Sequence, residues 1–315
     1  MSVSSPFAFL HFFSQTFGGS SMCPFCSSEI KAVKKGFYTR KSDGKRIQKY
    51  QCKQCFRVYS EQHFGIDYRL RLRDMNQPLF FSLCSGMSQR RCAHQYKTKP
   101  ATIARRVERF GKICQMNLES YRRTRPKATV VQIDEMESFE HSKCKPVTMP
   151  IVVEEKTRKI LCLRVGQIAA KGHLAAISRK KYGPRSCERK RCLKEVLGEL
   201  KGCVSEALVI KSDESPHYPD LIKEYFPGAL HRAYKGRRGC VVGQGELKKG
   251  GFDPIFTLNH SYAMIRDNVK RLSRRTWCTT KLQTKLELFL FIYAWFHNLW
   301  LDRNVQPIKL VRVDG

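Results

Sequence analysis

Short apolar runs rich in β-branched residues recur along the second half of the chain, and such runs are typical of buried strands. They lie at residues 130–133, 150–153, 159–165, 207–210 and 229–233, and the charged segment 154–158 predicts a hairpin turn. Helical patterns predict helices at residues 187–201 and 219–226. This order of strands and helices predicts a mixed α/β domain over residues 130–315, with helices packed on a central sheet.

Three helical segments come before this domain. An apolar helix is predicted at residues 78–84, a second at 87–95, and a third from Pro100, because Pro is tolerated in a first helical turn. In the third helix the apolar residues recur at helical spacing, and basic residues lie largely off that stripe, at Arg105, Arg106 and Arg109. Residues 68–120 therefore predict a helix-turn-helix that binds DNA, although many three-helix units only pack against their neighbours.

Two further segments are predicted to lack a fold of their own. Residues 121–129 are basic and contain Pro126, which is typical of a linker. Residues 1–21 include an apolar stretch, but it lacks the positive amino-terminal region and the cleavage site of a signal peptide. We expect a disordered extension there, with Met1 or Met22 as the start of the protein.

Four of the 14 cysteines form two Cys-x-x-Cys pairs, with 25 residues between Cys26 and Cys52. The pairs present four thiolates, Cys23, Cys26, Cys52 and Cys55, to one tetrahedral ion, which predicts a zinc ribbon over residues 22–62. The alternatives are a chance pairing or a redox couple, and no surrounding βαβ pattern supports the latter. The other ten cysteines are scattered, which indicates free thiols in a reducing compartment, here the cytoplasm.

The charge balance indicates a polyanionic partner. Lys and Arg number 59 against 27 Asp and Glu, a formal net charge of +32, which suits nucleic acid or an anionic membrane surface. No apolar run reaches the roughly 18 residues of a membrane span. The zinc ribbon and the basic helices explain the charge better than a membrane-surface helix would. We therefore expect double-stranded DNA as the partner and no membrane.

Acidic residues are scarce, so their positions are informative. Asp134 directly follows the apolar run 130–133, and Asp213 stands just after the run 207–210. Both are expected at strand ends that face a cleft, where two carboxylates from one sheet can bind Mg²⁺ or Mn²⁺. Two such ions can drive phosphodiester chemistry. The alternative is that these carboxylates cap strands or pair with nearby lysines.

The motifs MCPFC…KYQCKQCFRVYS, SGMSQRRCAHQY, VVQIDEMESF, IKSDESPHYPDLIKEYF and LNHSYAMIRDNVKRLSRRTW span the chain from Met22 to near its end. In them the chain resembles the DDE-type transposases of bacterial insertion sequences that carry an N-terminal zinc ribbon. The resemblance implies a ribonuclease-H-like catalytic domain with a mixed sheet and flanking helices. It also implies binding to the terminal inverted repeats of an element, followed by metal-dependent strand cleavage and strand transfer.

The resemblance maps the first two catalytic aspartates onto Asp134 and Asp213. The third position, usually Glu at the start of a late basic helix, falls on Asn259, with His260 and Asp267 as alternatives. An amide oxygen can still bind Mg²⁺, but the departure also admits an inactive, decayed or domesticated copy that acts as a DNA-binding regulator.

The late helix carries basic residues at a spacing that places them on one face, where they could hold DNA phosphates: Arg266, Lys270 and Arg274. A solvated basic face is the alternative. Because two element ends must be handled together, the resemblance implies a homo-oligomer, associated with the nucleoid.

Overall fold

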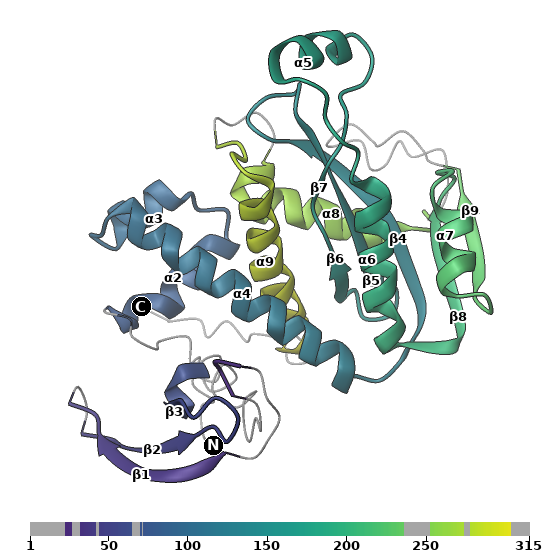
Figure 1. The fold of residues 1–315 in the computed structure, drawn as a ribbon. Coiled ribbons are helices and arrows are strands. Elements are labelled where there is room, and N and C mark those ends of the chain that lie inside the picture. Colours follow the sequence, from purple (N-terminus) through teal and green to yellow (C-terminus); the bar gives the residue numbers. More distant parts are fainter. Residues whose placement is uncertain are drawn as a thin grey trace, which may run out of the picture. The chain divides into compact units, whose positions relative to one another are not determined.

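The computed structural model describes residues 23–26, 32–41, 44–64, 70, 72–235, 253–273 and 278–303 (Figure 1). The chain divides into two compact units, Met1–Leu79 and Phe80–Gly315. The predicted extension at residues 1–21 lies outside the described residues. In the described part, no helix is both long enough and apolar enough to cross a membrane.

The first unit contains a three-stranded antiparallel sheet in the order β1-β2-β3. Its elements are β1 (Val33–Thr39), β2 (Arg46–Gln51), β3 (Val58–Ser60) and the 3-10 turns η1 (Glu61–Phe64) and η2 (Arg73–Met75). Every residue of β1 is exposed, and among the described residues of this unit the buried cluster consists of Cys23, Cys52 and Tyr59, with Ala32, Tyr50 and Cys55 partly buried against it. So small a core supplies little folding free energy, which is the situation in which a structural metal stabilises a domain.

The three predicted helices are present as α2 (Asn76–Cys84), α3 (Gln89–Gln95) and α4 (Pro100–Thr124). Ser88 caps α3 by accepting a hydrogen bond from the amide of Arg91, and Pro100 opens α4. However, α4 is 25 residues long and packs along α9 (Gln283–Arg303). The three helices therefore exist, but the structure does not show them as a helix-turn-helix.

The linker expected at residues 121–129 is wrong, because α4 continues to Thr124 and only three residues separate it from β4 (Ala128–Phe139). Two arginines tie this end of α4 to the sheet and to α6 (Arg189–Leu200) of the same unit. The side chain of Arg122 forms an ion pair of 3.0 Å with Glu199 and donates to the Leu161 carbonyl. Arg125 forms an ion pair of 2.6 Å with Glu154. Both arginine side chains are more than nine-tenths buried, so this segment is part of the folded core.

The second unit is built on a six-stranded mixed sheet in the order β6-β5-β4-β8-β9, with β7 paired to β5. Besides β4, its strands are β5 (Pro146–Glu154), β6 (Ile160–Leu163), β7 (Gly166–Gln167), β8 (Val204–Asp213) and β9 (Leu230–Tyr234). Strand β8 runs parallel to β4 and β9, whereas β5 runs antiparallel to β4 and β6. This confirms the mixed α/β class and all five predicted strands; β7 was not predicted.

Helices cover both faces of this sheet (Figure 1). Val131 and Ile133 of β4 pack with α6 (Arg189–Leu200) and α7 (Tyr218–Tyr225). The alternate residue Gln132 points to the other face and binds α8 (Phe256–Asn268), accepting from the amide of Leu258. The remaining elements of this unit are α5 (Leu174–Tyr182) and the 3-10 turns η3 (Lys201–Cys203) and η5 (Lys270–Leu272).

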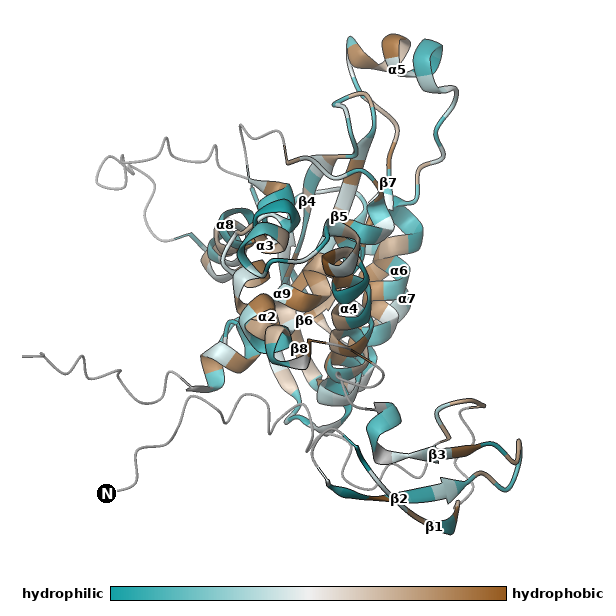
Figure 2. Ribbon diagram, turned by 90° about the vertical axis from the view of Figure 1, so that its left-hand side faces the viewer, coloured by the Kyte–Doolittle hydropathy of each residue, from teal (hydrophilic) through white to brown (hydrophobic). Residues whose placement is uncertain are grey.

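Helix α9 is hydrophobic along most of its length and largely buried (Figure 2). It packs against α4 and beside β6. The side-chain amide of Asn298 donates to the Ile160 carbonyl and accepts from the Ile160 amide, both at 2.8 Å. Asn298 thus satisfies backbone groups at the outer edge of β6, where an unpaired strand would be prone to aggregation.

Candidate active site and metal centre

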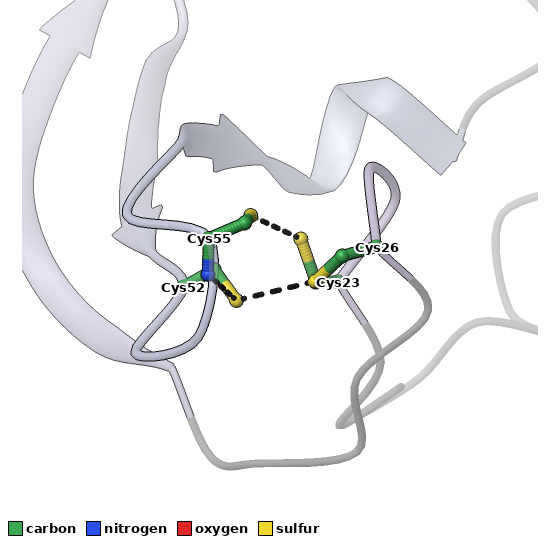
Figure 3. A group of neighbouring side chains, drawn as sticks. All are labelled: Cys23, Cys26, Cys52 and Cys55. Atoms are coloured by element: carbon green, nitrogen blue, oxygen red, sulfur yellow. Dashed lines mark hydrogen bonds between the residues drawn. The ribbon is translucent and has the colours of Figure 1, made fainter.

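The four predicted zinc ligands come together in the first unit (Figure 3). The sulfur atoms of Cys23 and Cys55 lie 3.6 Å apart, and those of Cys26 and Cys52 lie 3.7 Å apart. Four thiolates bound tetrahedrally at about 2.3 Å from zinc would be separated by about 3.8 Å. The cluster therefore has the dimensions of a four-cysteine zinc site, as the spacing of the two pairs predicted.

Backbone amides turn toward these sulfurs. Cys52 Sγ accepts from the amides of Gln54 at 3.3 Å and Cys55 at 3.5 Å, and Cys23 Sγ accepts from the amide of Phe25. The Cys55 amide is the main cause that lowers the pKa of Cys52 to about 6. A thiol that ionises readily is a good zinc ligand, because the thiolate is the species that binds the metal.

The second site lies on the central sheet, where Asp134 and Asp213 stand at equivalent positions of neighbouring parallel strands. Gln132 of β4 pairs with Lys211 of β8, and each aspartate follows two residues later in its own strand. Residues two apart share a face of a strand, so both carboxylates leave the same face of the sheet. The sequence predicted that these two residues meet, and the register supports it.

The predicted position of Asp134 at a strand end is wrong. Strand β4 continues to Phe139, and its pairing with β5 runs from Val131 to Phe139. The extra acidic residues are tolerated in a strand because Arg189 of α6 forms ion pairs of 2.7 Å with both Glu135 and Glu137. Asp134 therefore lies within the sheet, while Asp213 ends β8.

Burial raises the pKa of Asp134 to about 7, and the nearby Asp213 carboxylate adds to this, while a hydrogen bond of 2.6 Å from the Glu135 amide opposes it. Two partly buried carboxylates that repel each other gain from a shared divalent cation, and their oxygens are the hard ligands that Mg²⁺ prefers. In the part of the chain that the structure describes, no third Asp, Glu or His joins them in a tight cluster.

The late helix α8 lies over this pair. Leu258 at its start donates 2.9 Å to Gln132, and Asp134 acts electrostatically on Tyr262 one turn further along. Asn259, Tyr262 and Arg266 follow at spacings of three and four, so they share one stripe of α8. Asn259 is exposed, and its side-chain amide donates 2.7 Å to Asp253.

The two alternative third ligands face elsewhere. His260 acts electrostatically on His297, and Asp267 acts on Tyr293. His297 and Tyr293 belong to α9, whereas the charge of Asp134 acts on Tyr262. Of the three candidates, Asn259 is therefore the one on the stripe that faces the aspartate pair.

The predicted DNA-contacting residues divide into several groups. Arg105 is exposed and Arg109 partly exposed, but Arg106 is only 4% exposed, so Arg106 is a wrong prediction for a surface contact. The single basic face on the late helix is also wrong, because α8 ends at Asn268 and Lys270 opens a separate 3-10 turn. Arg274 lies outside the described residues.

Of the predicted DNA-contacting residues on the late helix, Arg266 is the one that lies near the aspartate pair. Its positive charge lowers the pKa of Asp134, whereas burial raises it. Sequence reasoning missed two tyrosines near the aspartates, Tyr218 and Tyr262, both buried. The signal in the sequence that could have found them is their closeness to predicted site residues. Tyr262 follows Asn259 by three residues, and Tyr218 follows Asp213 by five.

No family model matches the chain, and no curated protein matches it in sequence. Among solved structures, the chain is similar to the catalytic domain of Mos1 mariner transposase. The identity is 12%, the match covers 63% of this chain and 94% of that one, and the TM-score is 0.22. With a likeness of this size, function has to be argued from the site itself.

Proposed function

We propose that the protein is a DDE-type transposase with a ribonuclease-H-like catalytic domain. The observation that carries this is the register of β4 and β8, which sets Asp134 and Asp213 side by side on the face covered by α8. Antiparallel strands followed by a parallel strand, with the acidic pair on the central strands, agree with the architecture that the resemblance implies.

In this proposal Asp134, Asp213 and Asn259 hold the divalent cation. Bound there, Mg²⁺ or Mn²⁺ would activate the attacking oxygen and stabilise the leaving oxygen of a phosphodiester, first in hydrolysis that frees a 3′ hydroxyl and then in strand transfer. Asn259 donates to Asp253 through Nδ2, so that bond does not use the Oδ1 that would bind the cation. Arg266 supplies positive charge beside the carboxylates, where it can hold a DNA phosphate.

Double-stranded DNA is the proposed partner. The zinc ribbon and the helical region with Arg105 and Arg109 would bind the terminal inverted repeats, and Arg266 and Lys270 would position the end to be cut. A homo-oligomer associated with the nucleoid is the proposed working state, because two ends must be joined to one target.

A non-catalytic DNA-binding regulator is the second candidate. It is favoured by Asn259, an amide where a carboxylate is usual, which is exposed and already bonded to Asp253. The two candidates differ in one experiment, which is Mg²⁺-dependent nicking of a plasmid that carries the element's own ends. Nicking that requires Asp134 and Asp213 supports the transposase, and tight DNA binding without nicking supports the regulator.

A further inference from the structure

Two buried tyrosine hydroxyls lie next to the aspartate pair. Tyr218 is 0% and Tyr262 4% exposed, and neither hydroxyl has a hydrogen-bond partner in the part of the chain that the structure describes. Buried polar groups are nearly always hydrogen-bonded. Two neighbouring exceptions at a candidate active site therefore indicate a ligand that supplies the missing partners.

The geometry places Tyr262 beside Asp134. Leu258 is fixed to Gln132 by a 2.9 Å hydrogen bond. Tyr262 follows Leu258 by about one helical turn, and Asp134 follows Gln132 by two residues on the same face of β4. The charge of Asp134 acts on the phenol of Tyr262, so the two side chains lie near one another.

Tyr218 reaches the pair from the other helix. It opens α7, directly after the turn in which Asp213 accepts a hydrogen bond of 3.1 Å from the Ser215 amide. The charges of both Asp134 and Asp213 act on its phenol. The two hydroxyls thus come from α7 and α8, which cover different faces of the sheet, and both lie near the same carboxylates.

We propose that Tyr218 and Tyr262 are positioning residues for the divalent cation at Asp134 and Asp213. Their hydroxyls would hydrogen-bond to the oxygen ligands of that cation, above all to a bound water. The inference rests on the proposed function and deepens it. Phenol hydroxyls can donate and accept, so they can orient an attacking water without carrying charge into a site that already holds two carboxylates. Partners of this kind, one shell beyond the ligands, tune metal affinity.

The test uses the full-length protein and Mn²⁺ binding followed by electron paramagnetic resonance, together with single-turnover cleavage of element-end DNA. Tyr218→Phe and Tyr262→Phe should each weaken Mn²⁺ binding and slow cleavage by about tenfold, with DNA affinity unchanged and thermal stability equal or higher. Tyr293→Phe is the matched control, a buried tyrosine of α9 whose hydroxyl interacts with Asn268. It should lose some stability and keep Mn²⁺ binding.

Wild-type Mn²⁺ binding in both Tyr218→Phe and Tyr262→Phe would overturn this inference and leave the proposed function standing. If Asp134→Asn also binds Mn²⁺ like the wild type, the proposed metal site itself is wrong, and this inference falls with it.

A separate observation concerns α5, which stands apart from the other helices in both views (Figures 1 and 2). The segment between β7 and α6 contains no acidic residue from Ile168 to Cys187, and five basic ones: Lys171, Arg179, Lys180, Lys181 and Arg185. Ser178 fixes α5 by donating 2.6 Å to the Cys144 carbonyl. Arg179, Lys180 and Lys181 are exposed and form no ion pair within the described residues.

We propose that α5 is a DNA-backbone contact. The charge is held on a fixed helix, and the exposed aliphatic surface beside it is limited to Ile177 and small residues. This favours phosphates of double-stranded DNA over a lipid surface, which would need a wide apolar face.

The test is fluorescence anisotropy on linear duplex DNA across a salt series. Changing Arg179, Lys180 and Lys181 to Gln should weaken binding at least tenfold and reduce the slope of log K against log salt by roughly 2–3. Lys156→Gln with Lys223→Gln removes exposed charges elsewhere and should change little. An unchanged salt slope in the α5 variant would overturn the inference. So would a variant that binds DNA like the wild type and loses only its binding to anionic phospholipid vesicles. Both outcomes are independent of whether the protein cleaves DNA.

Discussion

Asp134 and Asp213 lie side by side because β4 and β8 are parallel and in a register that pairs Gln132 with Lys211. Each aspartate follows its paired residue by two, so a strand shift of one residue would send one carboxylate to the opposite face. The site therefore depends on the register of two strands that are joined only through a long crossover containing β5, β6 and α6.

Removing either charge should abolish catalysis. We expect Asp134→Asn and Asp213→Asn to reduce Mg²⁺-dependent cleavage by at least about a hundredfold, because an amide binds the cation more weakly than a carboxylate. Binding to element-end DNA, measured by anisotropy, should stay within about twofold of the wild type. Glu214→Gln, an exposed neighbour of Asp213, is the control. Cleavage that survives either Asp substitution refutes the assignment.

The pKa of Asp134 predicts how stability depends on pH without added Mg²⁺. Burial raises this pKa to about 7, above the value of about 3.9 in an unfolded chain. The contribution of the protonated group is therefore complete below about pH 4 and is lost as the pH rises through about 7.

At pH 8 the Asp134→Asn protein should consequently be more stable than the wild type, by up to about 4 kcal/mol. At pH 4 the difference should vanish. Urea unfolding at both pH values measures it, and added Mg²⁺ should stabilise only the wild type. Equal stability at pH 8 would contradict the burial of Asp134.

Zinc removal should unfold the first unit. Because its core contains little besides Cys23, Cys52 and Tyr59, loss of the metal leaves no other large source of folding free energy. Cys52→Ser should lose zinc, measured by elemental analysis, and residues 32–64 should become sensitive to protease, while the second unit stays resistant. Cys187→Ser, an exposed cysteine outside the cluster, should keep one zinc per chain.

Two helical glycines predict opposite effects of the same substitution. At Gly111 of α4, an added Cβ would lie 2.6 Å from the Leu288 Cβ of α9, so Gly111→Ala should destabilise the protein by about 1–3 kcal/mol. At Gly198 of α6 the nearest atom is at 3.6 Å, and Gly198→Ala should stabilise by roughly 0.5–1 kcal/mol. Thermal unfolding of both variants checks the pair, and a stable Gly111→Ala protein would show that α4 and α9 can move apart.

The sequence by itself determined the local features of this protein. The runs that became β4, β5, β6, β8 and β9 are visible because apolar β-branched residues cluster over the length of a strand. The cysteine pairs predict their cluster because two residues between the cysteines of a pair allow both thiolates to bind the same ion. The two aspartates could be predicted as neighbours because each follows an apolar run, although β4 continues past Asp134 and only Asp213 stands at a strand end.

Only the tertiary structure decided the rest. Arg106 lies three residues after Ile103 and four before Phe110, on the apolar stripe of α4, but only the packing shows that a charged side chain there is buried while Arg105 is exposed. Helix α4 continues into the expected linker, where Arg122 and Arg125 form ion pairs with Glu199 and Glu154, residues farther along the chain. The tyrosines of the site are ordinary in sequence. They are distinguished by what they face, and that is fixed by contacts between segments that local patterns do not encode.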